Sequence, residues 1–176
     1  MRLDSRPIII TRQKGETLIE VIVATVVFAV GILGNLGLQS ASVQSNKSSL
    51  HQTKAIIAAN DIAHRIRANR SAALTGEYNG YVSTSPPSNP GCTLVPCNSA
   101  NIAQYQLFDW SQNFSNVYGD DRFINLLPDG AATINFDDVN NEYSIEVSWT
   151  EQAYENSDKG SIKSNRTRAH RLILTI

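Results

Sequence analysis

The sequence predicts an α+β fold, in which a long N-terminal helix packs on an antiparallel sheet built from the C-terminal part of the chain. Three observations lead to this prediction. An apolar run from Thr17 to Leu38 continues into a segment whose apolar residues recur at helical spacing as far as Arg70. From Ala132 onward apolar and polar residues alternate, which is typical of strands with one buried face. Residues 71–96, between these parts, are rich in Gly, Ser, Pro and Asn and predict a loop.

The apolar run is about 20 residues long, which is enough for a helix to cross a bilayer core of about 30 Å. Residues 1–15 before it contain four basic residues and one acidic residue, so the positive-inside rule predicts a cytoplasmic N-terminus and an exported C-terminal part. A cleaved secretory signal is the alternative, with Ser40-Ala41-Ser42 as its cleavage site. Helical spacing continues through that site, which favours an uncleaved anchor.

Glu20 is the only charged residue within the apolar run. A carboxylate that lies unpaired in hydrocarbon costs about 3 kcal/mol. Glu20 can avoid this cost at the headgroup level, where the nearby helix N-terminus favours negative charge. It can also pair with a positive group on another subunit, and the residues themselves leave both readings open.

The segment Lys14-Gly15, followed by Thr17-Leu18-Ile19-Glu20-Val21 and an apolar helix, resembles the class III signal of type IV pilins and pseudopilins. The resemblance implies that a prepilin peptidase cuts between Gly15 and Glu16 and methylates the new amino group of Glu16. It also implies that Glu20 neutralises the free amine of a neighbouring subunit when the helices bundle.

Two features depart from the pattern of that family. The first residue after the cut is usually phenylalanine, and here it is Glu16. Major pilins often carry a helix-breaking proline in the region where this chain has Gly31, Gly34 and Gly37. These glycines predict either close helix packing in a membrane or a soft segment where the helix bends, and both readings stay open.

The resemblance divides the chain into three parts and implies a ladle-shaped pilin fold. Residues 1–15 are the leader, residues 16–38 are the transmembrane and assembly half of the helix, and residues 39–176 are the periplasmic head. The protein would cross the inner membrane once before assembly and would then lie in the extracellular pilus. Loss of the leader changes the formal net charge from −1 to −4, which gives no reason to expect an anionic partner.

The exported part contains one pair of cysteines, Cys92 and Cys97. A pair of this kind in an oxidising compartment predicts a disulfide, which would stabilise a tight loop by about 2 kcal/mol. The spacing is weak evidence for zinc, because no third or fourth ligand lies nearby.

The head begins with an amphipathic helix whose apolar residues recur every seven positions, and we expect this seam to lie under the sheet. Asp61 and Arg65 are four residues apart and should pair. The arginines at the end of the helix suit its negative C-terminal dipole, with a phosphate-binding patch as the alternative. The predicted seam consists of Leu36, Val43, Leu50 and Ile57 and is extended by Ile62 and Ile66.

A second helix is predicted from Ala100 to Val117, capped by Ser99, with a core face of Leu107, Trp110, Phe114 and Val117. Three strands follow, joined first by a hairpin turn at Asn140-Asn141. Between the second and third strands, residues 151–167 are polar and charged and predict an exposed, mobile loop. The three predicted strands are residues 132–136, 143–150 and 172–176.

No arrangement of residues in the sequence predicts an enzyme, a metal site or a cofactor. The three histidines are far apart, and Asp120-Asp121 and Asp137-Asp138 lack the ligand spacing of a calcium loop. A basic segment near the C-terminus allows nucleic-acid binding as a less favoured alternative. Its cationic residues are Lys159, Lys163, Arg166, Arg168 and Arg171.

Within the superfamily, the chain is most similar to the PilV subgroup of minor pilins, the type IV pilus modification proteins. The resemblance implies an initiation or tip complex that primes pilus assembly and supports twitching motility and adhesion, with other minor pilins, the major pilin and prepilin peptidase as partners. Alternatives are a type II secretion pseudopilin, a DNA-binding competence minor pilin and, least favoured, a signal-anchored periplasmic enzyme. The residues that carry the likeness are 20–24, 31–34, 59–70, 126–130 and 143–149.

Overall fold

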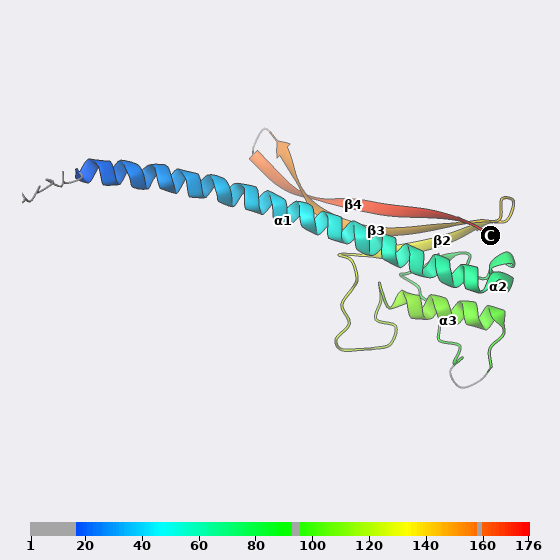
Figure 1. The fold of residues 1–176 in the computed structure, drawn as a ribbon. Coiled ribbons are helices and arrows are strands. Elements are labelled where there is room, and N and C mark those ends of the chain that lie inside the picture. Colours follow the sequence, from blue (N-terminus) through cyan, green and yellow to red (C-terminus); the bar gives the residue numbers. More distant parts are fainter. Residues whose placement is uncertain (1–16, 93–95, 158–159) are drawn as a thin grey trace, which may run out of the picture. The chain divides into compact units, whose positions relative to one another are not determined.

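The computed structural model describes residues 17–92, 96–157 and 160–176 of the chain. The chain divides into two compact units, Met1–Ser45 and Asn46–Ile176, and each is described by itself. Helix α1, Leu18–Ala68, contributes residues to both units (Figure 1). The helix predicted from Thr17 to Arg70 is therefore confirmed to within about two residues at each end.

The described part of the first unit consists of the N-terminal residues of α1. All of its residues from 17 to 45 are exposed, including the bulky apolar side chains. By length and composition α1 is the one helix of the described chain that is apolar enough to cross a membrane. Exposed side chains of this kind require an apolar environment from outside the chain, which agrees with the predicted anchor.

The second unit combines the rest of α1 with two short helices and a four-stranded antiparallel sheet. The sheet order β1-β2-β3-β4 follows the chain order, so each strand pairs with the next one along the chain. The predicted α+β class, a long N-terminal helix followed by an antiparallel sheet, is confirmed. The elements after α1 are α2 Arg70–Leu74, β1 Tyr81–Val82, α3 Ser99–Ser111, β2 Ala131–Asp137, β3 Glu142–Ser157 and β4 Gly160–Thr175.

The sheet buries one face and leaves the other partly exposed, as predicted. In β3 the buried residues alternate with partly exposed ones, because successive side chains of a strand point to opposite faces. The turn between β2 and β3 also lies where it was predicted. There Asp137 accepts hydrogen bonds from the backbone of Val139 and Asn140, and Asn141 adopts a φ of 53°, a conformation that asparagine tolerates better than most residues. The buried residues of β3 are Tyr143, Ile145, Val147 and Trp149.

The face of α1 that enters the core differs from the predicted seam. Leu36, Val43, Leu50 and Ile57 are all more than half exposed. The prediction was wrong because it followed only bulky apolar residues, whereas most of the buried residues of α1 are alanines. Ile62 and Ile66 do lie in the core, as predicted, and the buried stripe is otherwise made of alanines: Ala55, Ala58, Ala59 and Ala63.

The predicted loop at residues 151–167 is also wrong, because this region forms the outer halves of β3 and β4. The two strands pair without a break in register as far as Ser157↔Gly160. Their polar composition conceals the strand period, since neither face there is strongly apolar. Cross-strand charges stabilise such pairs, and an ion pair joins Arg168 to Glu151.

Helix α3 is shorter than predicted and has a different cap. It ends at Ser111 rather than Val117, and Asn98 rather than Ser99 accepts the capping hydrogen bond from the Asn101 backbone. Most residues of the predicted core face are nevertheless buried. Leu107, Trp110 and Phe114 are buried, although Phe114 lies in the turn after the helix and Val117 is only partly buried.

Ile62 and Ile57 provide a matched test of the face that α1 buries. Ile62 is completely buried, and Ile57 is 62% exposed. Ile62→Ala should lower the free energy of unfolding of the head by about 2–5 kcal/mol, whereas Ile57→Ala should change it by less than about 0.5 kcal/mol. Urea unfolding followed by the fluorescence of the buried Trp110 and Trp149 measures both. Equal losses in the two variants would contradict the assigned face.

Candidate assembly site

The candidate assembly residue, Glu20, lies in the first turn of α1 and is exposed. The helix starts with backbone hydrogen bonds from Glu20 and Val21 to the carbonyl of Thr17. The carboxylate therefore lies at the positive end of the helix dipole. Gly15 and Glu16, the predicted cleavage and methylation residues, lie outside the described residues.

The three glycines in the apolar half of α1 lie within regular helix. A Cβ atom added at Gly31, Gly34 or Gly37 would meet nothing within 4 Å in the described chain. The packing of this chain therefore gives no steric reason for glycine. Both predicted roles, close approach of a neighbouring helix and local bending, remain consistent with this geometry.

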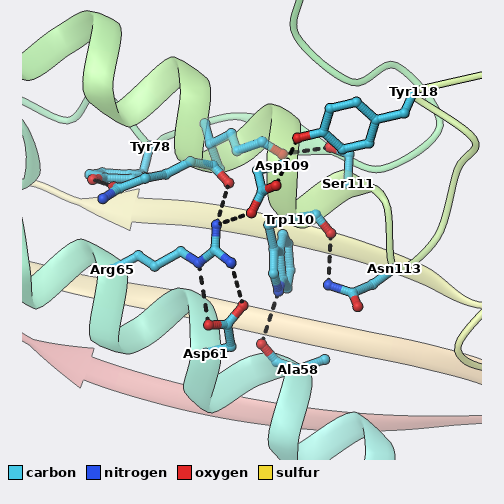
Figure 2. Close-up of polar contacts among 11 residues, drawn as sticks. Ala58, Asp61, Arg65, Tyr78, Asp109, Trp110, Ser111, Asn113 and Tyr118 are labelled. Atoms are coloured by element: carbon cyan, nitrogen blue, oxygen red, sulfur yellow. Dashed lines mark hydrogen bonds and ion pairs between the residues drawn. The ribbon is translucent and has the colours of Figure 1, made fainter. Parts of the chain in front are cut away.

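The head carries a polar cluster in which Arg65 of α1 joins α3 (Figure 2). Its guanidinium binds Asp61 of the same helix at 3.1 Å and Asp109 of α3 at 2.7 Å. The Tyr118 hydroxyl donates to the other oxygen of Asp109 at 2.8 Å. The predicted Asp61–Arg65 pair is confirmed, but no sequence pattern indicated Asp109, which is 44 residues from Arg65.

The contacts in this cluster shift the pKa values of Arg65 and Asp109. Burial alone would raise the pKa of Asp109, but the hydrogen bonds from Arg65 and Tyr118 outweigh it and hold the pKa below its usual value. Burial would lower the pKa of Arg65, and the two carboxylates reverse that effect and raise it. Arg65 and Asp109 are therefore both charged at neutral pH, and their ion pair holds α1 and α3 together.

Two further hydrogen bonds join α1 to α3. The indole nitrogen of Trp110 donates to the carbonyl of Ala58 at 3.0 Å, as Figure 2 shows. The side-chain amide of Asn69, just after α1, donates to the carbonyl of Ser99 at 2.7 Å. Trp110 is fully buried, so its indole N–H would be left without a partner if α3 shifted along α1.

A second polar cluster, centred on Glu151, joins α1 to the sheet. No sequence pattern indicated a role for Glu151. Its carboxylate accepts hydrogen bonds from Ser48 of α1 at 3.1 Å and from the indole of Trp149 at 2.8 Å. Arg168 of β4 lies 3.6 Å from the same carboxylate, whose side chain is 13% exposed. A largely buried carboxylate is stable only with such partners.

Two further features bear on the predicted chemistry of the chain, namely its metal-ligating side chains and its cysteines. Within the described ranges no group of three or more His, Cys, Asp or Glu side chains could hold a metal ion. The predicted disulfide joins Cys92 and Cys97, with Cα atoms 5.4 Å apart. It lies before α3, and Cys97 is next to the cap residue Asn98.

Ion pairs also engage part of the basic C-terminal segment. Arg168 pairs with Glu151, and Arg171 pairs with Glu146 at 2.6 Å. Lys159 lies outside the described residues, and the side chain of Lys163 is likewise outside them. The geometry therefore gives no specific support to the predicted nucleic-acid alternative.

Comparison with known proteins bears on both units. Residues 10–34 match the family model described as the prokaryotic N-terminal methylation motif, and residues 37–108 match the model described as type IV pilin Tt1218. Neither a curated protein nor a solved structure matches the chain. The two family matches support a place in the type IV pilin superfamily, as a structural component of a pilus or pseudopilus. The methylation motif implies processing by prepilin peptidase and assembly with other pilins.

The depressed pKa of Asp109 predicts an acid-dependent contribution to stability. Asp109→Asn should lower the free energy of unfolding of the head at pH 7 by about 1–2 kcal/mol, because a partly exposed charged pair is lost. The unfolded state binds a proton at a higher pH than the folded state. The contribution of Asp109 is therefore fully present above about pH 4. It disappears as the pH falls through the lowered pKa that Asp109 has in the folded state.

Urea unfolding at pH 7 and at decreasing pH measures this effect, with Asp121→Asn, which removes an exposed carboxylate, as the control. The gap between the parent and Asp109→Asn should close in acid, while the Asp121 variant should match the parent throughout. A gap that stays constant with pH would show that Asp109 acts through its shape and not through its charge.

Proposed function

We propose that this chain is a minor pilin of the PilV type, which joins a minor-pilin complex that primes assembly of a type IV pilus and supports twitching motility and adhesion. The observation that carries the proposal is the single exposed carboxylate, Glu20, at the start of an uncovered apolar helix and within the methylation-motif match at residues 10–34. The match of residues 37–108 to a type IV pilin model, which includes part of the head, also supports the proposal.

The proposed mechanism starts with the precursor in the inner membrane, where Lys14 and the rest of the leader lie on the cytoplasmic side. Prepilin peptidase cuts between Gly15 and Glu16 and methylates the new terminus at Glu16. The cut removes the leader and creates a positive amine at the start of the apolar helix. This amine is the charge that Glu20 of an adjacent subunit requires.

Pairing of these two charges then makes the assembled state lower in free energy than the separate subunits. An unpaired carboxylate in hydrocarbon costs about 3 kcal/mol, and an unpaired charged amine there has a similar cost. Pairing between subunits offsets both costs, provided that each charge has its partner. The apolar side chains of α1 between residues 17 and 45, which are exposed in this chain, pack against other helices at the same time.

The head would remain outside the helix bundle and contact the other minor pilins and the major pilin. Its polar clusters around Arg65 and Glu151 keep α3 and the sheet fixed on α1. A rigid head offers the same loops in every subunit, which specific assembly requires. A type II secretion pseudopilin uses the same N-terminal chemistry, so cellular phenotypes must separate the two machines.

Processing is the first test. The intact mass and N-terminal sequence of the membrane-extracted protein should give a chain that begins at Glu16, with a methyl group, only when prepilin peptidase is present. Retention of residues 1–15 in both strains would indicate a plain signal anchor. A start near residue 42 in both strains would indicate an ordinary secreted protein.

Glu20→Ala tests the assembly step. The variant should insert into the membrane normally, because the change removes a charge from an apolar segment. It should be absent from sheared pili, and surface pili should fall in number. Glu20→Asp, which keeps the charge, should retain part of the incorporation. Normal copurification of Glu20→Ala with pili would contradict the proposed role, and loss of protein secretion with normal pili would favour the pseudopilin.

A further inference from the structure

The two edges of the sheet differ in whether their outward backbone groups have hydrogen-bond partners within the described chain. The outer side of β2 is covered by β1 and by two side chains from the adjoining loops. The side chain of Asn79 accepts from the Phe136 backbone at 2.9 Å, and the Ser83 hydroxyl accepts from the Ala132 backbone at 2.8 Å. Backbone donors on this edge, which a two-residue strand alone would leave open, are thereby satisfied.

The opposite edge is formed by β4, a strand of 16 residues that ends the sheet (Figure 1). No strand of the described chain pairs with its outer side. In an antiparallel pair only alternate residues direct their backbone groups toward the partner, so the other residues of β4 direct theirs outward. A long edge of this kind is a template for another extended chain.

The charges on the two paired strands indicate what such a chain must contain. Strand β4 has four basic residues and no acidic residue, and β3 has four acidic residues and no basic residue. The register places Glu146 opposite Arg171 and Glu151 opposite Arg166. The chain itself therefore pairs β4 with an acidic strand.

The arginines of β4 keep the capacity to bind a second neighbour. The side chains of Arg168 and Arg171 remain 53% and 65% exposed despite their ion pairs. A guanidinium has five N–H donors, more than one carboxylate uses. Arg166 and Arg168, two residues apart, lie on one face of the strand, whereas Arg171 and the exposed Ile173 lie on the other.

A second copy of β4 is a poor occupant for this edge. Antiparallel pairing of β4 with itself would bring two rows of arginines together, and like charges on paired strands are destabilising. An acidic strand meets no such penalty. The charge pattern therefore selects a different segment over a second copy of this one.

We propose that the outer edge of β4 binds an extended acidic peptide segment of a partner protein, which adds a fifth strand to the sheet. Backbone hydrogen bonds to the edge would supply affinity, and carboxylates facing Arg166, Arg168 and Arg171 would supply specificity. The proposal goes beyond pilus assembly, because it concerns the sheet of the head and holds whether or not Glu20 acts in assembly.

The test uses the full-length chain in detergent and a synthetic peptide, Thr-Val-Thr-Glu-Thr-Thr-Glu-Thr-Glu-Thr. In antiparallel register this peptide places valine opposite Ile173 and its three glutamates opposite the three arginines. A peptide with glutamine in place of glutamate is the control. Fluorescence anisotropy measures binding, and amide hydrogen exchange reports where the peptide binds.

The acidic peptide should bind and slow exchange in β4, and the glutamine peptide should bind at least about tenfold more weakly. The double variant Arg166→Gln, Arg171→Gln should weaken binding of the acidic peptide by about tenfold. The matched control, Arg67→Gln with Arg70→Gln, removes the same charge from exposed helical positions and should leave binding unchanged.

Three outcomes would overturn the proposal. Equal weakening in both double variants would indicate general attraction to a basic surface. Binding without slower exchange in β4 would place the peptide elsewhere. Slower exchange in β4 with rising protein concentration, in the absence of peptide, would make a second copy the occupant.

Discussion

The packing of α1 in one core with the sheet and α3 is the constraint on which the rest of the head depends. Four of the buried positions of the helix are alanines, and they belong to the same core cluster as residues of α3 and the sheet. Only a short distance then separates the Ala58 carbonyl from the indole of Trp110. Bulkier residues on this face would separate the helix from its neighbours and leave that buried indole unsatisfied.

The two polar clusters hold this packing in register along the helix. Arg65 fixes α3 through Asp109, and Ser48 fixes β3 through Glu151. Each cluster joins residues that are far apart in sequence, and each contains a carboxylate with several hydrogen-bond donors. A hydrophobic contact tolerates sliding more readily than a charge-assisted hydrogen bond does, so these clusters specify one position of the helix on its neighbours.

Local periodicity explains which parts of the fold could be predicted from the sequence. The long helix, the β2–β3 hairpin and the Asp61–Arg65 pair depend on residues that are near one another in the chain, and all three were predicted. The alanine stripe was not recognised, because alanine occurs on both faces of helices. The outer halves of β3 and β4 were not recognised either, since pairing there depends on a partner strand rather than on an apolar period.

The candidate sites also differ in whether neighbouring residues of the sequence indicate them. The motif around Glu20 is local and could be read directly, whereas Asp109 and Glu151 acquire their roles only from the tertiary contacts of Arg65 and Ser48. The disulfide between Cys92 and Cys97 was predictable because the chain offers a single pair. No pattern within one strand indicates that it will end a sheet, so the open edge of β4 required the topology.

The separation of the core from the exposed apolar helix has an evolutionary consequence. Every residue of the hydrophobic core lies at position 55 or beyond, and none of the described residues before 46 is buried. Substitutions in the core of residues 46–176 therefore leave the exposed apolar residues of α1 unchanged. Conversely, substitutions among residues 17–45 remove no side chain from that core. The two parts of one gene product can adapt at different rates.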